Sequence, residues 1–156
     1  MKQFNIIHLH RTLIVLAAIL LVNIADGKTY TAINSGKWSD PNTWENGAPG
    51  NNISANDEVI IKNHITMNSD VSVNGTLTIV KGISMTSNKT LVINTDGKLI
   101  NNGNVTVKRI VNEGTIYNNS MLEAMCDIDN KGTVNNNSNM LAGNDFRNTG
   151  GKRGRQ

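Results

Sequence analysis

The sequence predicts an all-β protein, a single-stranded parallel β-helix in which successive turns of the chain stack along one axis. The first observation is a repeat of eighteen residues, because the segment 110–127 aligns with 128–145 without a gap and with nine identities. A period this short is too small for separate globules. Each copy is therefore expected to be one coil of a stack whose core forms only between coils.

The second observation is an apolar residue at every sixth position of the repeat. The series is Ile110, Ile116, Leu122, Ile128, Val134, Met140 and Phe146. Because six is an even number, an extended backbone directs all of these side chains to one face, whereas a helix would distribute them around its axis. The pattern therefore predicts short strands separated by bends, three to a coil.

Bends are predicted four residues after each apolar position. These positions hold small or turn-forming residues: Gly114, Ser120, Cys126, Gly132, Ser138, Asn144 and Gly150. Glycine and asparagine adopt backbone conformations that other residues avoid, so the chain can turn sharply there. Cys126 is the only cysteine, so no internal disulfide can form, and its place in the repeat predicts a bend position outside the core.

The register extends toward the N-terminus with coils of changing length. Segment 93–109 keeps the pattern at seventeen residues, and segment 71–92 forms a looser coil of twenty-two. Parallel coils about 4.8 Å apart pair their backbone groups with the coils above and below. We therefore predict that residues 59–151 form four to five coils. Three sixes per coil also suit a left-handed helix, but the longer early coils favour the right-handed form.

The chain contains 26 asparagine residues, and many recur at equivalent positions of successive coils. One series is Asn112, Asn130 and Asn148, and another is Asn102, Asn119 and Asn137. Asparagine tolerates left-handed backbone conformations, and its amide can bond to the identical amide one coil away. These columns are therefore predicted to be structural ladders. The alternative is that the rows of amides present donors and acceptors to a ligand.

Residues 1–27 have the pattern of an export signal. Lys2 and Arg11 precede an apolar run over residues 13–22, and residues 25–27 include small side chains suited to cleavage. The run is shorter than the roughly 20 residues that a membrane helix needs. We therefore expect cleavage, a secreted or cell-surface location and no stable membrane span. Retention of the segment as an N-terminal anchor is the alternative.

The charge distribution argues against a nucleic-acid partner. The formal net charge is +3, and removal of residues 1–27 leaves thirteen basic and eleven acidic side chains. Three of the basic side chains lie in residues 152–156, which are predicted to form a basic disordered tail. No basic stripe with interleaved aromatic residues runs through the rest of the sequence.

Residues 28–58 differ in composition from the repeats and are predicted to cap the first coil. Trp38 and Trp44 bracket a turn signal at 39–42. An uncovered coil end leaves unpaired backbone groups that invite edge-to-edge association, and two indoles are suited to cover it. Alternatively, Trp38, Trp44 and Tyr30 could stack on sugar rings, because an aromatic face suits the apolar side of a pyranose.

The C-terminal end of the predicted coils has no comparable cover in this sequence. The repeat begins a further coil at Phe146 and is abandoned in the segment 150–156, which contains no apolar residue. We therefore expect that the C-terminal coil can support self-association. The chain is either a small stand-alone coil or the front of a longer protein.

Several motifs near the start of the chain point to a family. They are W-S-D-P-N-T-W, Gly47-Ala48-Pro49-Gly50, Asn56-Asp57-Glu58-Val59-Ile60-Ile61, His64-Ile65-Thr66 and Asn74-Gly75-Thr76-Leu77. This opening, over about residues 30–80, resembles secreted bacterial right-handed β-helix proteins of the pectate-lyase-like class. It is also similar to the eight-glycine extracellular domain of cell-surface hyaluronidase-type proteins. The resemblance implies a β-helix that degrades or binds polysaccharides, or that serves as an adhesin or spacer.

Few side chains in the sequence are grouped for chemistry. A lyase would need carboxylates that hold calcium beside an Arg or Lys base. The nearest approach is Asp127 stacked over Asp145, with Asp129 adjoining and Arg109 one coil earlier. Stacked carboxylates repel unless a cation or a guanidinium separates them. Asp127 and Asp145 are therefore a candidate metal pair, and a solvated turn is the alternative.

We expect no catalytic residues and no cofactor. No paired His or Cys at zinc-ligand spacing follows the predicted signal, and no nucleophile-elbow motif is present. The predicted protein is a non-enzymatic exported β-helix module, structural or adhesive, that presents a polar flank to an extracellular glycan or a surface protein. The alternative is the N-terminal part of a carbohydrate-active enzyme, polysaccharide lyase or hyaluronidase-like, whose active coils lie beyond residue 156.

Overall fold

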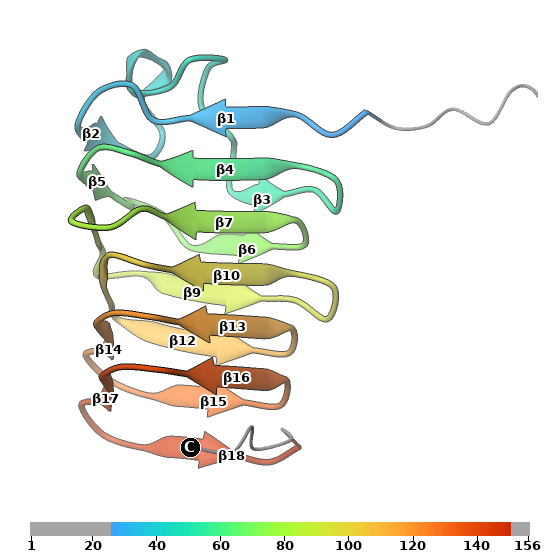
Figure 1. Ribbon diagram of the computed structural model, residues 1–156, viewed down its shortest axis with the longest axis vertical. Coiled ribbons are helices and arrows are strands. Elements are labelled where there is room, and N and C mark those ends of the chain that lie inside the picture. Colours follow the sequence, from blue (N-terminus) through green and yellow to red (C-terminus); the bar gives the residue numbers. More distant parts are fainter. Residues whose placement is uncertain (1–25, 151–156) are drawn as a thin grey trace, which may run out of the picture.

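The computed structural model describes residues 26–150, which form a parallel β-helix of about five turns (Figure 1). Three parallel sheets of six strands each make up its sides, and each coil contributes one strand to every sheet. The predicted all-β fold is confirmed. The predicted tail at 152–156 and the predicted signal, except for its last two residues, lie outside the described residues.

The strands are assigned sheet by sheet. Sheet 1 consists of β1 (Thr29–Thr31), β4 (Glu58–Ile61), β7 (Thr76–Ile79), β10 (Lys98–Asn101), β13 (Thr115–Asn118) and β16 (Thr133–Asn136). Sheet 2 consists of β2 (Gly36–Lys37), β5 (Ile65–Thr66), β8 (Ser84–Thr86), β11 (Asn104–Val107), β14 (Leu122–Ala124) and β17 (Met140–Ala142). Sheet 3 consists of β3 (Asn52–Ile53), β6 (Val71–Val73), β9 (Thr90–Ile93), β12 (Arg109–Asn112), β15 (Ile128–Asn130) and β18 (Phe146–Asn148).

The coil is right-handed. In Figure 1 the strands of sheet 1 run leftward on the near side, sheet 2 closes the left edge, and sheet 3 returns on the far side while the chain descends from β1 to β18. Crossover connections between parallel strands favour this hand because the strands themselves are twisted. The fold therefore agrees with the right-handed form favoured by the sequence.

The length of the coils changes along the axis. In sheet 1, Thr29 pairs with Glu58, Glu58 with Thr76, Thr76 with Lys98, Lys98 with Thr115 and Thr115 with Thr133, which are steps of 29, 18, 22, 17 and 18 residues. The predicted coils of 22, 17 and 18 residues are all present. The first step is long because residues 32–51 leave the strand pattern, and this segment carries both tryptophans.

The interior is filled by columns of aliphatic side chains, one coil above the next. The buried columns are Val59, Leu77, Leu99 and Ile116 in sheet 1, Ile65, Met85, Val105 and Leu122 in sheet 2, and Val71, Leu91, Ile110 and Ile128 in sheet 3. The predicted six-residue series points inward. Its burial is lost only at the last coil, where Val134 and Met140 are half-buried and Phe146 is 48% exposed.

Two inner columns change from aliphatic residues to asparagine partway along the axis. Ile61 and Ile79 are followed by Asn101, Asn118 and Asn136, and Val73 and Ile93 are followed by Asn112, Asn130 and Asn148. Each amide nitrogen donates to the amide oxygen of the next coil. The distances are 2.8 and 2.7 Å in the first column and 2.6 and 3.1 Å in the second.

The second of these columns is the ladder that the sequence predicted, and the first is an additional buried one. The predicted exposed row also forms, because Asn119 donates to Asn102 at 2.9 Å and Asn137 donates to Asn119 at 2.8 Å. The expected left-handed backbone is not used. Within residues 26–150 no residue other than glycine has a positive φ, so the asparagines stabilise the stack through their amides alone.

The glycines of the repeat are required for close approach between coils, not for an unusual φ. A Cβ built on Gly114 would lie 2.2 Å from the carbonyl oxygen of Asn94, and one on Gly132 would lie 2.1 Å from that of Gly114. Each corner of the coil therefore rests directly on a carbonyl of the preceding coil. A side chain at these positions would force the coils apart.

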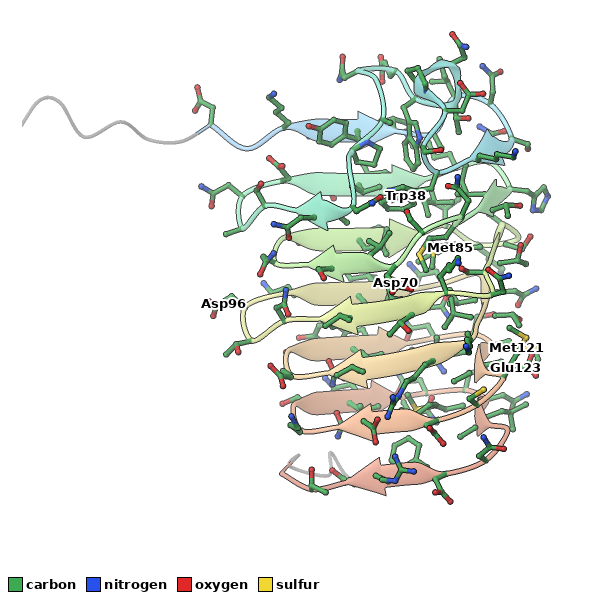
Figure 2. All side chains as sticks on the ribbon, turned by 180° about the vertical axis from the view of Figure 1, so that it is seen from behind. Trp38, Asp70, Met85, Asp96, Met121 and Glu123 are labelled. Atoms are coloured by element: carbon green, nitrogen blue, oxygen red, sulfur yellow. The ribbon has the colours of Figure 1, made fainter. Side chains whose placement is uncertain are left out.

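The segment 28–58 forms the first coil and also covers its end. Its strands β1, β2 and β3 are the first strands of the three sheets. Trp38 and Trp44 are buried and lie edge to face with their ring centroids 5.2 Å apart. The Trp38 indole nitrogen donates to the carbonyl of Gly50 at 2.7 Å, and that of Trp44 donates to the carbonyl of Trp38 at 2.9 Å. Both indoles are therefore held inside the lid (Figure 2).

Burial of both tryptophans leads to a spectroscopic prediction. Because Trp38 is 0% and Trp44 3% exposed, the fluorescence emission of the folded protein should be blue-shifted, and iodide should quench it far less than it quenches the unfolded chain. Iodide quenching titrations in buffer and in denaturant provide the comparison. Efficient quenching of the folded protein would contradict the buried lid.

The buried ladder leads to a stability prediction with a neighbouring control. Asn118 is fully buried and donates to Asn136 and to the carbonyl of Asn139, whereas Asn119 is exposed. Asn118→Ala should lower the free energy of unfolding by about 2–4 kcal/mol, because it leaves buried partners unsatisfied, whereas Asn119→Ala should cost less than about 1 kcal/mol. Urea denaturation of the two variants tests this, and equal costs would contradict the assignment of the ladder.

Candidate functional site

Two arginines and three aspartates form an ion-pair cluster on the outer side of the last coils. Arg109 contacts Asp129 through two donors and lies 3.8 Å from Asp127. Arg147 lies 2.9 Å from Asp129, 2.9 Å from Asp145 and 3.7 Å from Asp127. The parallel register creates the cluster, because it places Arg147 beside Asp129 on neighbouring strands of sheet 3.

The cluster shifts the protonation equilibria of its members. Partial burial acts to raise the pKa of Asp129, but hydrogen bonds from Arg109 and Arg147 and their positive charges outweigh it and hold this pKa below the ordinary value of an aspartate. The bond to Asp129, and then the bond to Asp145, raise the pKa of Arg147. All five groups therefore stay charged and paired near neutral pH.

The structure places the candidate metal pair, Asp127 and Asp145, against the guanidinium of Arg147. This group relieves the repulsion that motivated the metal hypothesis. Within residues 26–150 no group of three or more His, Cys, Asp or Glu side chains is arranged to hold a metal ion. Arg147 was missed in the sequence, although its position two residues after Asp145 puts both side chains on the outer face of one strand.

The three aromatic candidates for sugar stacking do not form an exposed platform. Trp38 and Trp44 are buried in the lid, so neither offers an accessible ring face in this conformation. Tyr30 pairs with Val59 and is half-buried against the core. These positions agree with the alternative interpretation, in which the aromatic residues cover the first coil.

A row of threonines on the outer face of sheet 2 is the most regular polar surface near a hollow. Thr66 pairs with Thr86, and Thr86 pairs with Thr106, so their hydroxyls recur at the strand spacing of about 4.8 Å. Thr66 and Thr86 are exposed, and in the described part of the chain neither side chain makes a hydrogen bond. Thr106 donates to Glu123 at 3.3 Å. We call Thr66, Thr86 and Thr106 the threonine row.

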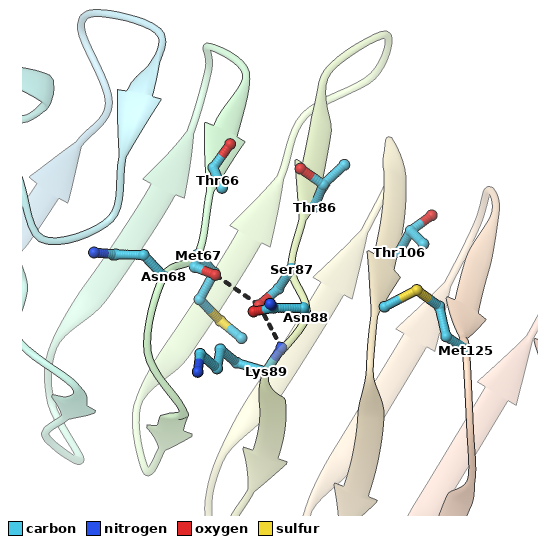
Figure 3. Close-up of a pocket in the computed structure, with 9 residues that line it drawn as sticks. All are labelled: Thr66, Met67, Asn68, Thr86, Ser87, Asn88, Lys89, Thr106 and Met125. Atoms are coloured by element: carbon cyan, nitrogen blue, oxygen red, sulfur yellow. Dashed lines mark hydrogen bonds between the residues drawn. The ribbon is translucent and has the colours of Figure 1, made fainter.

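An open hollow of about 530 Å³ lies beside this row, at the bend between sheets 2 and 3 (Figure 3). It is lined by the threonine row and by Met67, Asn68, Ser87, Asn88, Lys89 and Met125. The buried hydroxyl of Ser87 forms its floor, where it donates to the carbonyl of Met67 at 2.6 Å and accepts from the backbone of Lys89 at 2.9 Å. The hollow thus combines hydroxyls, amides, one amine and an apolar thioether.

The residues of the hollow were not identified from the sequence. The notable signal was the recurrence of Thr66, Thr86 and Thr106 at intervals of twenty residues, but these intervals fall in coils of a length different from the eighteen-residue repeat. Only the pairing of β5, β8 and β11 shows that the three positions coincide. Sequence reasoning was confined to the regular coils and to the aromatic residues.

The fold defines the class of protein as a right-handed parallel β-helix with a lid of its own chain over the first coil. Comparisons of the chain with profiles of protein families, with the sequences of curated proteins and with solved structures find no match. Among the described residues there is no helix long and apolar enough to cross a membrane.

The ion-pair cluster leads to a prediction about acid stability. Because the folded-state pKa of Asp129 is lowered, its contribution is fully present above the ordinary aspartate pKa of about 3.9 and is lost as the pH falls through the lower, folded-state value. Asp129→Asn should therefore remove part of the decline of stability in this window, and Arg147→Gln, which removes one of two donors, should remove less. Thermal unfolding between pH 2 and 7 measures it, and an unchanged pH profile would contradict the assignment.

Proposed function

We propose that the protein is a non-enzymatic, exported β-helix module that holds a glycan against the threonine row and the adjoining hollow. The observation that carries the proposal is the threonine row itself, in which free hydroxyls stand in register beside a polar recess. The charged and apolar pattern of residues 1–27 supports export. A structural or adhesive role outside the cell follows from these two features.

The chemistry of the row suits a carbohydrate. A threonine hydroxyl both donates and accepts hydrogen bonds, as sugar hydroxyls do, and β-branching restricts the side chain to few rotamers, so little entropy is lost on binding. The spacing of about 4.8 Å between coils is close to the length of one sugar unit in an extended chain. Lys89, Asn68 and Asn88 add an amine and two amides at the same edge.

The remaining polar groups support a scaffold role for the rest of the molecule. The buried amides of Asn101, Asn112, Asn118 and Asn130 bond to other coils. The carboxylates of the cluster are paired with two guanidiniums. These groups stabilise the stack, and the outer face of sheet 2 is left to interact with a partner.

The second candidate is the N-terminal part of a carbohydrate-active β-helix enzyme. The motifs at residues 30–80 that resemble the pectate-lyase-like class favour it. In that case the surface on sheet 2 would guide a polysaccharide toward coils beyond residue 156. Both candidates require glycan binding by the described coils, and release of unsaturated or shortened sugars from the bound polymer would favour the enzyme.

The proposed function is tested by binding with a matched pair of variants. The full chain should retain members of a glycan array, and Thr86→Val should weaken the best of them by roughly three- to tenfold, as expected for loss of one hydrogen bond without loss of shape. Thr78→Val makes the same change on the outer face of sheet 1 and should leave binding unchanged.

Three outcomes of this experiment contradict the proposal. An array on which no glycan is retained removes the glycan as partner, and a protein captured by the Thr86 surface instead would replace it. Equal weakening by Thr78→Val and Thr86→Val would show that the contact is not at the threonine row. Unfolding of either variant is checked by circular dichroism.

A further inference from the structure

The N-terminal end of the β-helix is closed by hydrogen bonds from its own lid. The backbone nitrogen of Glu45 donates to the carbonyl of Thr31 at 2.9 Å, and the amide of Asn46 donates to the carbonyl of Thr29 at 2.8 Å. Trp44 also forms an antiparallel bridge with Ala32. The free edge of β1 is thereby occupied, so no further strand can add to sheet 1 at this end.

The C-terminal end is finished differently. Strands β16, β17 and β18 are the last of their sheets, and within residues 26–150 each pairs with a strand on one side only. Between them lie Val134 and Met140, which are half-buried, and Phe146, which is 48% exposed. Open strand edges around an apolar centre are a template for another strand, and burial of the apolar groups would stabilise such a contact.

The backbone of β18 determines which groups face the open side. The carbonyl of Asp145 accepts from Ile128, and the nitrogen of Thr149 donates to Asn130, both at 2.9 Å. These alternate residues face β15, so the N–H and C=O of Phe146 point away from it. Asp145 and Arg147 flank Phe146 on the outer face, 64% and 46% exposed.

We propose that this open end pairs with the same end of a second copy, about a two-fold axis that passes through Phe146. β18 then pairs with its counterpart in antiparallel orientation, and the two Phe146 residues exchange both backbone hydrogen bonds. Each Asp145 lies opposite the Arg147 of the other copy. The proposal goes beyond the glycan-binding function and does not depend on it.

Charge complementarity is the reason that the occupant is a second copy. An antiparallel pair centred on Phe146 brings together residues one position to either side, and these carry opposite charges, so the strand is complementary to itself across the axis. The same rotation exchanges the sheet edges formed by β16 and β17, so all three edges of one copy meet edges of the other. The closed N-terminal lid prevents head-to-tail addition, so the contact produces a closed dimer instead of a filament.

Position-specific crosslinking tests the axis. In an antiparallel pair whose residues exchange backbone bonds the Cα atoms lie about 5.5 Å apart, within the range that a disulfide spans. In a Cys126→Ser background, Phe146→Cys should therefore give a covalent dimer under mild oxidation. Ile33→Cys is the control, because Ile33 is 51% exposed but lies in the lid at the other end. Both variants keep the full chain, so any association through residues 13–22 is common to them.

A charge variant tests the complementarity. Asp145→Lys places a lysine opposite each Arg147 and should raise the dissociation constant of the dimer at least tenfold in sedimentation equilibrium. Asp96→Lys makes the same change at an exposed bend in the middle of the solenoid (Figure 2) and should have no comparable effect. Circular dichroism establishes that both variants keep the β-helix.

Each alternative outcome overturns the proposal. A chain that is monomeric at all concentrations, with a thiol at 146 that reacts freely with a labelling reagent, leaves the end unoccupied. A thiol at 146 that neither reacts nor crosslinks shows that residues 151–156 of the same chain cover it. Equal crosslinking at 33 and 146, equal weakening by the two lysine variants, or assemblies larger than a dimer would each exclude the two-fold axis.

Discussion

The whole structure depends on the backbone register between coils. Parallel hydrogen bonding stacks each residue on its equivalent one coil earlier at about 4.8 Å, so the nature of a side chain is constrained by the one below it. Aliphatic residues therefore form continuous columns, and asparagines form ladders in which each amide is both donor and acceptor. The glycines follow from the same constraint, because a Cβ on Gly114 would collide with a carbonyl of the preceding coil.

The change from aliphatic to amide columns divides the interior into two parts. At one transition Asn101 follows Ile79, and its oxygen accepts from the backbone of Gly103 at 3.2 Å. At the other, Asn112 follows Ile93, and its buried oxygen has no hydrogen-bond partner in the described part. Such a group costs about 1–3 kcal/mol. The coil boundary between Ile93 and Asn112 is therefore a weak step in a fold whose other coils reinforce one another.

The molecule presents two kinds of surface that arise from different parts of the coil. The sides carry outward-pointing residues whose spacing is set by the strands, and the threonine row on sheet 2 is of this kind. The ends expose backbone edges, and only the first is covered by the lid of residues 32–51. Binding on a side leaves the ends free, so lateral recognition and association through the last coil are compatible.

Much of the architecture could be predicted from the sequence, because a repeat with an even period carries its own structural information. The inward series from Ile110, the ladder of Asn112, Asn130 and Asn148, and the bend positions all follow from local alternation and periodicity. The half-buried bend at Cys126 is also in place. Its reason is finer than the repeat shows: Val107 pairs with Ala124 but Ile110 pairs with Ile128, so the added residue lies at this bend.

The tertiary structure alone decided which side chains meet across coils of unequal length. The threonine row, the hollow beside Lys89 and the placement of Arg147 between the aspartates depend on offsets of 17 to 20 residues that change from sheet to sheet. The same holds for the lid, where burial of Trp38 and Trp44 depends on a 29-residue first step without an internal repeat. Periodicity determines the direction of a side chain, whereas its neighbours depend on where each bend absorbs the additional residues.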